Sequence, residues 1–193
     1  MSVPDREADE NVVFRGEMPS DSTITNNMAT SNGGGIVITK GQAFIGYCTI
    51  YSNTAKDKDR GEGGGIAIIG FGIQVSISDS ILADNTAKSG ADILGKIILY
   101  SRNLIQNVSG ATLALSDGLA KLPLTGKPPD VGSLQYNGGS TQTRALLPNS
   151  PAIDQIPLND ITCAQLSTDQ RGITRPQGKG CDLGAYEYVL VVH

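Results

Sequence analysis

The residues that could carry out acid–base or nucleophilic chemistry are few and scattered in this sequence. Its single histidine is His193, beside the chain terminus, where side chains are seldom held in fixed positions. A Ser-His-Asp or Cys-His arrangement needs a histidine held against its nucleophile, so hydrolases of these classes are not expected. The glycine triplets at residues 33–35 and 63–65 lack the Lys-Ser/Thr pair and the helix of a nucleotide-binding loop.

Carboxylates offer the remaining route to catalysis. Enzymes that cleave polysaccharides use paired carboxylates, or an Arg or Lys base with acidic metal ligands. Asp79, Asp84 and Lys88 are the nearest candidates, but they lie at the ends of predicted strands and we expect them to be surface charges. The sequence therefore predicts a non-enzymatic protein. A fragment of a polysaccharide lyase or glycoside hydrolase is the alternative, and it rests on analogy with the fold predicted below.

A second group of charged residues lies near the C-terminus, among glycines and prolines. It comprises Asp154, Asp169, Arg171, Arg175, Asp182 and Glu187. Such residues can fix an irregular segment through charge-assisted hydrogen bonds to turn amides, and this is the structural role we predict. Calcium is the alternative, because carboxylates are hard oxygen ligands. Since no run has the ligand spacing of a calcium-binding loop, no cofactor is expected.

The three cysteines fall into two groups. Cys163 and Cys181 lie 18 residues apart in the same turn-rich region, and we predict that they form a disulfide. Closing this loop would stabilise the segment by about 3 kcal/mol in the chain-entropy model. A disulfide also indicates an oxidising compartment outside the cytoplasm. Cys48 aligns with Ser80 in the repeat described next, and we predict that it is reduced and buried.

An internal repeat must position all of these residues. Three segments align on an Asn-x-Ala ending at Asn27, Asn53 and Asn85, and the first two are followed by the glycine triplets. The spacings are 26 and 32 residues, and the additional residues fall in loops. We predict that the three asparagines stack in one column whose amides hydrogen-bond between repeats. A row of ligand-binding amides is the alternative.

Each repeat has the pattern of short strands with alternating polarity separated by turns. In the common register Ile36 lies over Ile66, and Ile45 lies over Ile77, so the apolar side chains form interior ladders. The β-branched residues, the glycines and the lack of a 3.6-residue period argue against a helical solenoid. The predicted fold is all-β, namely a right-handed parallel β-helix (a solenoid) with an irregular C-terminal cap.

The repeat divides the chain into three regions. Residues 1–21 are expected to form an N-terminal edge or a partial first coil, residues 22–121 the β-helix coils, and residues 122–193 an irregular cap that wraps the end of the stack. A cap is expected because an exposed terminal coil leaves open backbone edges. The first residues lack the apolar core of a secretory signal, and the repeat begins almost at once, which favours a fragment of a longer protein.

Several C-terminal motifs occur in a characteristic order. They are the residues 136–143, 145–154, 168–172, 175–178 and 181–187. Together with the glycine-rich repeats, they resemble the terminal signature of bacterial right-handed β-helix surface proteins that carry the so-called choice-of-anchor Q domain and resemble polymorphic outer-membrane-protein-like repeats. Two places depart from that signature: Arg144 stands where His is usual, and Gln155-Ile156 stands where Ala-Gly is usual. The resemblance implies an exported protein tethered to the cell envelope, and it implies no substrate.

Composition and charge limit the partners. Lys and Arg number 15 against 19 Asp and Glu, without a basic cluster, so no nucleic acid partner is expected. No apolar run reaches the ~18 residues of a membrane span. We expect a structural or adhesive segment of a secreted or cell-surface protein, with extracellular polysaccharide or other envelope components as partners. A glycan- or ice-binding surface is a further alternative. Its polar residues would be Thr23, Thr25, Gln74, Ser76 and Ser78.

Overall fold

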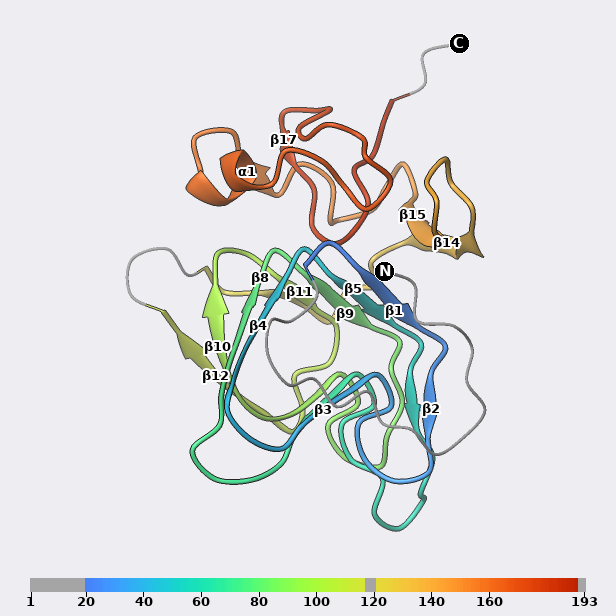
Figure 1. The fold of residues 1–193 in the computed structure, drawn as a ribbon, viewed down its shortest axis with the longest axis vertical. Coiled ribbons are helices and arrows are strands. Elements are labelled where there is room, and N and C mark those ends of the chain that lie inside the picture. Colours follow the sequence, from blue (N-terminus) through green and yellow to red (C-terminus); the bar gives the residue numbers. More distant parts are fainter. Residues whose placement is uncertain (1–19, 117–120, 191–193) are drawn as a thin grey trace.

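The chain folds as a set of short strands that pair mainly in parallel (Figure 1). The computed structural model describes residues 20–116 and 121–190. The predicted all-β class is confirmed, since the helical content of these residues is the single short helix α1 (Ile161–Gln165). Within the described ranges, no helix is both long enough and apolar enough to cross a membrane.

Strands recur in the same order along successive repeats. The first repeat contains β1 (Thr23–Thr25), β2 (Met28–Ala29), β3 (Ile36–Ile38) and β4 (Gln42–Gly46). The second contains β5 (Thr49–Tyr51), β6 (Thr54–Ala55), β7 (Ile66–Ile68) and β8 (Gln74–Ser78). The third contains β9 (Ile81–Ala83) and β10 (Ile93–Tyr100), and the fourth contains β11 (Leu104–Ile105) and β12 (Ala111–Leu115), followed by β13 (Leu124–Thr125).

Equivalent strands of successive repeats form two main faces. The covered sheet has the order β1-β5-β9-β11-β13. The open sheet consists of β4, β8, the second half of β10, and β12, all paired in parallel. The first half of β10 instead continues the pairing of β3 with β7. Stacking therefore turns strands too short to be stable alone into ladders that run across the repeats.

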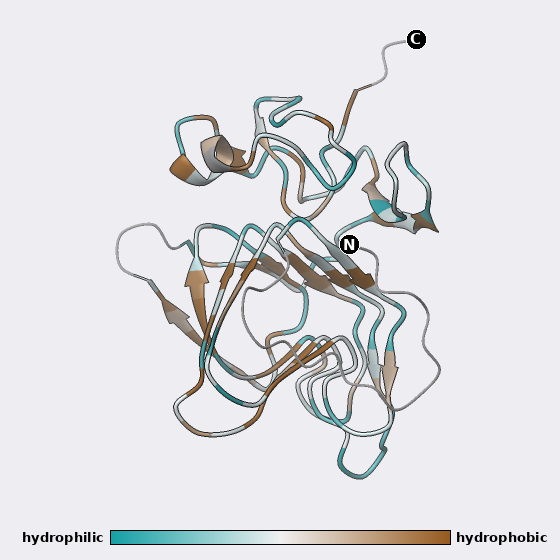
Figure 2. Cartoon of the chain, in the orientation of Figure 1, coloured by the Kyte–Doolittle hydropathy of each residue, from teal (hydrophilic) through white to brown (hydrophobic). Residues whose placement is uncertain are grey.

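The interior ladders follow the predicted register. Ile36 pairs with Ile66, and Ile45 pairs with Ile77. All four side chains are fully buried and belong to one apolar cluster. The stacked strands are correspondingly among the hydrophobic parts of the ribbon (Figure 2). The glycine triplets permit this close stacking, because a Cβ atom at Gly34 would clash with backbone atoms of the next repeat.

The C-terminal segment (residues 130–190) is mostly irregular, as predicted, but it also contains short regular elements. It contains an antiparallel hairpin of β14 (Val131–Gln135) and β15 (Thr143–Leu146). It also contains a second antiparallel pair of β16 (Ile156–Pro157) and β17 (Gly180–Cys181), with α1 between these two strands in sequence. These elements are two to five residues long, and longer irregular stretches connect them.

The position of this segment also corrects the prediction. It lies against the outer face of the covered sheet and not over the end of the stack (Figure 1). Ala185 donates its amide hydrogen to Thr49 Oγ1 at 3.1 Å, and Gly184 donates to the carbonyl oxygen of Asp79 at 2.8 Å. The physical reason is the outward pair Ile81 and Leu104, since apolar residues on an outer face must be covered.

Candidate functional site

The predicted asparagine column is present, and its side-chain amides hydrogen-bond to one another from repeat to repeat. Asn27 Nδ2 donates to Asn53 Oδ1 at 2.9 Å, and Asn53 Nδ2 donates to Asn85 Oδ1 at 3.0 Å. Asn85 Nδ2 then donates to Asp92 Oδ1 at 2.8 Å. Asn53 is fully buried. The geometry fits a structural ladder, because these amide atoms already bind one another and nearby backbone carbonyls.

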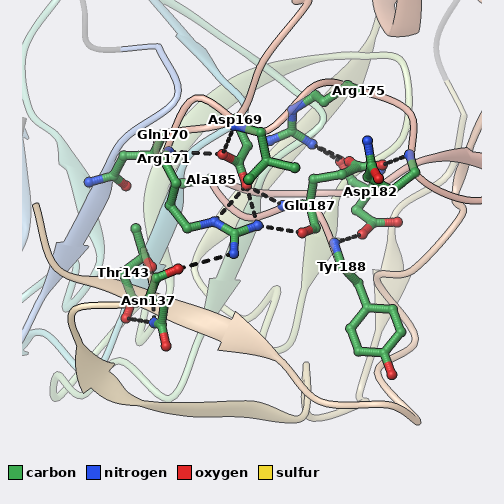
Figure 3. Close-up of polar contacts among 12 residues, drawn as sticks. Asn137, Thr143, Asp169, Gln170, Arg171, Arg175, Asp182, Ala185, Glu187 and Tyr188 are labelled. Atoms are coloured by element: carbon green, nitrogen blue, oxygen red, sulfur yellow. Dashed lines mark hydrogen bonds and ion pairs between the residues drawn. The ribbon is translucent and has the colours of Figure 1, made fainter. Parts of the chain in front are cut away.

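The predicted C-terminal charges come together in one buried network (Figure 3). Arg171 binds Asp169 Oδ2 through Nε at 2.9 Å and Nη2 at 2.6 Å, and its guanidinium lies 3.5 Å from the centre of the Tyr186 ring. Nη2 of Arg171 also donates to the carbonyl oxygen of Glu187 at 2.6 Å. This arginine therefore joins the 168–172 and 181–187 motifs.

Arg175 forms the second half of the network. Its Nη1 lies 2.8 Å from Glu187 Oε2, and both side chains are fully buried. Its Nη2 lies 3.3 Å from Oδ1 of Asp21, a residue that directly precedes the first repeat. The guanidinium also lies 5.0 Å from the centre of the Tyr47 ring. One buried cation thus ties the C-terminal segment to the first and second repeats.

The remaining carboxylates of the network accept backbone N–H groups. Asp182 accepts from Asp154 N at 2.7 Å and from Tyr188 N at 2.6 Å, while Asp154 Oδ1 accepts from Gly180 N at 2.9 Å. Burial raises the pKa of Asp182 to about 7, and the nearby charge of Glu187 adds to this effect. The carboxylate oxygens of Asp182 and Asp154 thus accept hydrogen bonds from groups of the protein itself, as expected for a structural network. Among the described residues, no group of three or more His, Cys, Asp or Glu side chains is arranged to hold a metal ion.

The cysteines are arranged as predicted. Cys163 and Cys181 form a disulfide with a Cα–Cα distance of 5.5 Å. Both residues are buried in the apolar cluster between the C-terminal segment and the covered sheet. Cys48 is not part of this disulfide, and its burial raises the pKa of its thiol to about 12. Its backbone N–H donates to Ser80 Oγ at 3.0 Å, in agreement with the aligned repeats.

The three candidate catalytic charges occupy different environments. Asp84 and Lys88 are exposed, as predicted; Asp84 accepts from Ser52 Oγ at 2.9 Å, and Lys88 Nζ donates to the carbonyl oxygen of Asp59 at 2.7 Å. Asp79, which we predicted to be a surface charge, is instead fully buried. The reason is the lateral position of the C-terminal segment, which covers the junction between the open and covered sheets. His193 lies outside the described residues.

Asp79 lines a cavity of about 310 Å³ between the open sheet and α1. The cavity is lined by Ser20, Phe44, Gly46, Tyr47, Ser78, Asp79, Tyr100, Ser101, Ile161, Thr162 and Leu166. Ser78 Oγ donates to Asp79 Oδ2 at 2.5 Å, whereas Oδ1 has no hydrogen-bond partner within the described part of the chain. Burial raises the pKa of Asp79 to about 6, although the hydroxyls of Ser101 and Thr162 favour its ionised form.

Sequence reasoning missed several residues that hold the segment in place. Arg144 Nε donates to Thr25 Oγ1 at 2.9 Å, and its guanidinium lies 4.4 Å from the centre of the Tyr51 ring. Gln170 Oε1 accepts from Thr23 Oγ1 at 2.7 Å. Arg144 departs from the signature that the C-terminal motifs resemble, and this was visible in the sequence, but its partners Thr25 and Tyr51 were not.

Comparisons with protein-family models, curated proteins and solved structures gave no match. The resemblance to choice-of-anchor surface proteins therefore stays a prediction. Function is inferred below from the residues and geometry of this chain.

Proposed function

We propose that this chain is a non-enzymatic structural or adhesive segment of an exported bacterial envelope protein, built as a right-handed parallel β-helix. The lateral fastening of the C-terminal segment carries the proposal. Ionic and hydrogen-bonded contacts from this segment reach Asp21, Thr23 and Thr49, and apolar contacts reach Ile81 and Leu104. The charged groups that the sequence offered are thus used to hold successive repeats together.

The right-handed β-helix is the simplest continuous path through the observed ladders. Each repeat returns to pair in parallel with the one before it, from β1 through β5 to β9 and from β4 through β8 to β10. Connections between parallel strands of one sheet are right-handed in about 98% of proteins. We therefore assign a right-handed path to the successive repeats.

Export is supported by the cysteine chemistry and by the C-terminal motifs. The disulfide between Cys163 and Cys181 is buried, and such structural disulfides are typical of oxidising compartments. The motifs of residues 168–187 resemble an envelope-protein signature, and Arg171 and Arg175 are the residues that connect them. The proposed partners are extracellular polysaccharide or other envelope components.

Surface labelling tests the proposal. Antibodies raised against the purified chain are applied to intact and to lysed cells of the source bacterium, with and without protease treatment of the intact cells. Peptide mapping without reductant is then used to follow Cys163 and Cys181. We expect labelling of intact cells that protease removes, and a bridged peptide pair. Labelling only after lysis, with both thiols reduced, would contradict export.

Polysaccharide cleavage is tested separately. The purified chain is incubated with pectic, alginate and glucan polymers, and unsaturated products and new reducing ends are measured. We expect neither to increase over a heat-treated control. Turnover that disappears in Asp79→Asn would instead support the enzymatic alternative and identify the buried carboxyl group as part of its machinery.

A further inference from the structure

We propose that the outer face of the open sheet, together with the cavity beside Asp79, is a binding site for a neutral oligosaccharide. This inference rests on the proposed function as an adhesive segment and names the ligand class that such a segment would hold. It is argued from the aromatic side chains, the polar columns and the buried carboxyl group on that side of the molecule.

Two aromatic rings stand on the open sheet. Phe44 on β4 and Tyr100 at the end of β10 have ring centroids 6.4 Å apart in an edge-to-face arrangement. The exposed fractions of Phe44 and Tyr100 are 52% and 37%. The next residue after Phe44, Ile45, is fully buried, because successive side chains of a strand point to opposite faces. Two adjacent exposed rings offer flat apolar faces, and these match the apolar faces of sugar rings.

Hollows adjoin these rings on more than one side. A hollow of about 280 Å³ is lined by Gln42, Ala43, Phe44, Gln74 and Ser76. Another, of about 410 Å³, is lined by Lys96, Ile98, Tyr100, Ala114, Leu115 and Ser116. Phe44 lines both the first hollow and the Asp79 cavity, and Tyr100 lines both the second hollow and the Asp79 cavity, so the three spaces are neighbours along the rings. A row of neighbouring hollows fits a ligand of several units better than a single small molecule.

The polar groups beside the rings are amides and hydroxyls. Gln42 pairs with Gln74 along the sheet, and Gln42 Nε2 lies 3.5 Å from Gln74 Oε1. Ser76 lies opposite Phe44 in the same register. Amide and hydroxyl groups both donate and accept hydrogen bonds, as sugar hydroxyls do. Lys96 is the single charged residue that lines the hollows of about 280 and 410 Å³, which favours a neutral chain.

The deepest polar group is Asp79. Its side chain is fully buried and lines the cavity, and its Oδ1 atom has no hydrogen-bond partner among residues 20–116 and 121–190. Buried acceptors in folded proteins are nearly always paired, so an unpaired one at a cavity wall indicates a missing donor. The hydroxyls of Ser101 and Thr162 line the same cavity and already favour the ionised carboxyl group, so a sugar hydroxyl that donates to Oδ1 would join an existing group of polar contacts.

An organic ammonium ion is the rival ligand, because a carboxylate among aromatic rings can also bind a cation. Such an ion would occupy only the cavity beside Asp79. The amide-lined hollow at Gln42 and Gln74 would then have no role. The extent of the neighbouring hollows therefore favours the oligosaccharide, and the experiment includes both classes.

Calorimetric titration of the full chain tests the proposal. The probes are the hexasaccharides of cellulose, xylan, starch and chitin, with choline and spermidine as the cationic probes. We expect saturable binding of at least one hexasaccharide with a Kd at or below about 1 mM. Phe44→Ala and Tyr100→Ala should each weaken that binding at least about tenfold, which corresponds to the loss of one stacking contact.

Phe71→Ala is the matched control, because Phe71 is fully exposed and lines none of the three hollows. It should bind like the unchanged chain, and circular dichroism should show that all variants are folded. If the folded, disulfide-bonded chain binds no hexasaccharide, or binds only choline or spermidine, this inference is overturned. The structural proposal is unaffected by that result, since surface labelling tests it independently.

Discussion

At the scale of single residues, the fate of a polar side chain depends on whether the protein supplies its partner. Asn53 is fully buried, and both its amide and its carbonyl oxygen are bonded within the column. Asp79 is equally buried but lacks a partner for Oδ1 within the described ranges. The two residues look alike in the sequence, where each is a short polar residue near a turn. Their different surroundings make one structural and the other a candidate for ligand binding.

The buried carboxyl group of Asp79 should make stability depend on pH. Its pKa is raised by burial from 3.8 to about 6, so the folded state holds the proton more tightly than the unfolded state. The resulting stabilisation is fully present below about pH 4 and is lost as the pH rises through about 6. Asp79→Asn should therefore gain about 1–3 kcal/mol of unfolding free energy relative to the unchanged chain between pH 4 and pH 7.

Urea unfolding at several pH values measures this difference. The backbone φ of Asp79 is positive, at 51°, and asparagine tolerates this backbone region, so the substitution is not expected to strain the turn. Asp84→Asn, at an exposed carboxyl group, is the control. Parallel pH profiles for Asp79→Asn and the unchanged chain would show that Asp79 does not hold a proton in the folded state.

At the scale of the elements, the sequence predicted the repeated strands and the register in which they pair. The register of Ile36 on Ile66 and of Ile45 on Ile77 follows from a local pattern that occurs twice within a few tens of residues. The fourth repeat continues this stacking, since Asn103 Oδ1 accepts from Ser80 N at 3.0 Å. The end of the asparagine column at Asp92 was missed, because no Asn-x-Ala motif marks it.

Removing one side chain from a ladder should be costly. Ile66→Ala should lower the free energy of unfolding by roughly 2–5 kcal/mol, because Ile66 is fully buried between the ladder residues Ile36 and Ile93 and its neighbours cannot close the cavity. Chemical denaturation measures the loss. Leu158→Ala, at a side chain that is 58% exposed, should change stability by less than about 0.5 kcal/mol. An equal effect of the two substitutions would show that the register is wrong.

The asparagine column should be most sensitive at its centre. Asn53→Ala removes the acceptor of Asn27 and the donor to Asn85, and should destabilise the chain by about 2–4 kcal/mol. Asn27→Ala, at the half-buried start of the column, should cost less because water can replace its contacts. Thermal unfolding of both variants checks the order. If Asn27→Ala proved the more harmful, the column would not be the unit that joins the repeats.

At the scale of the whole molecule, the position of the C-terminal segment could not be read from the sequence. Its contacts join residues far apart in the chain, such as Thr23 with Gln170, which are 147 residues apart. No periodic pattern connects such residues. The available clue was the apolar character of both faces of β9 and β11, where Ile81, Leu82, Leu104 and Ile105 are all fully buried. A sheet that is apolar on both faces must be covered on both.

Reduction of the disulfide should release the C-terminal segment before the repeats. Cys163 and Cys181 close a loop within the segment, whereas the ladders contain no disulfide and are held by their neighbours. Hydrogen exchange read by mass spectrometry, with and without reductant, should show faster exchange first in residues 156–188 and then in strands β9 and β11 of the covered sheet, against which the segment packs. The amides of β7 and β8 should stay protected.

Two variants serve as controls. The double variant Cys163→Ser and Cys181→Ser should reproduce the exchange pattern of the reduced chain. Cys48→Ser should exchange like the unchanged chain, if the C-terminal segment and the ladders unfold as separate units. Simultaneous loss of protection in β7 and in the segment would instead show that the covered sheet needs its outer layer in order to fold, and that the two form a single cooperative unit.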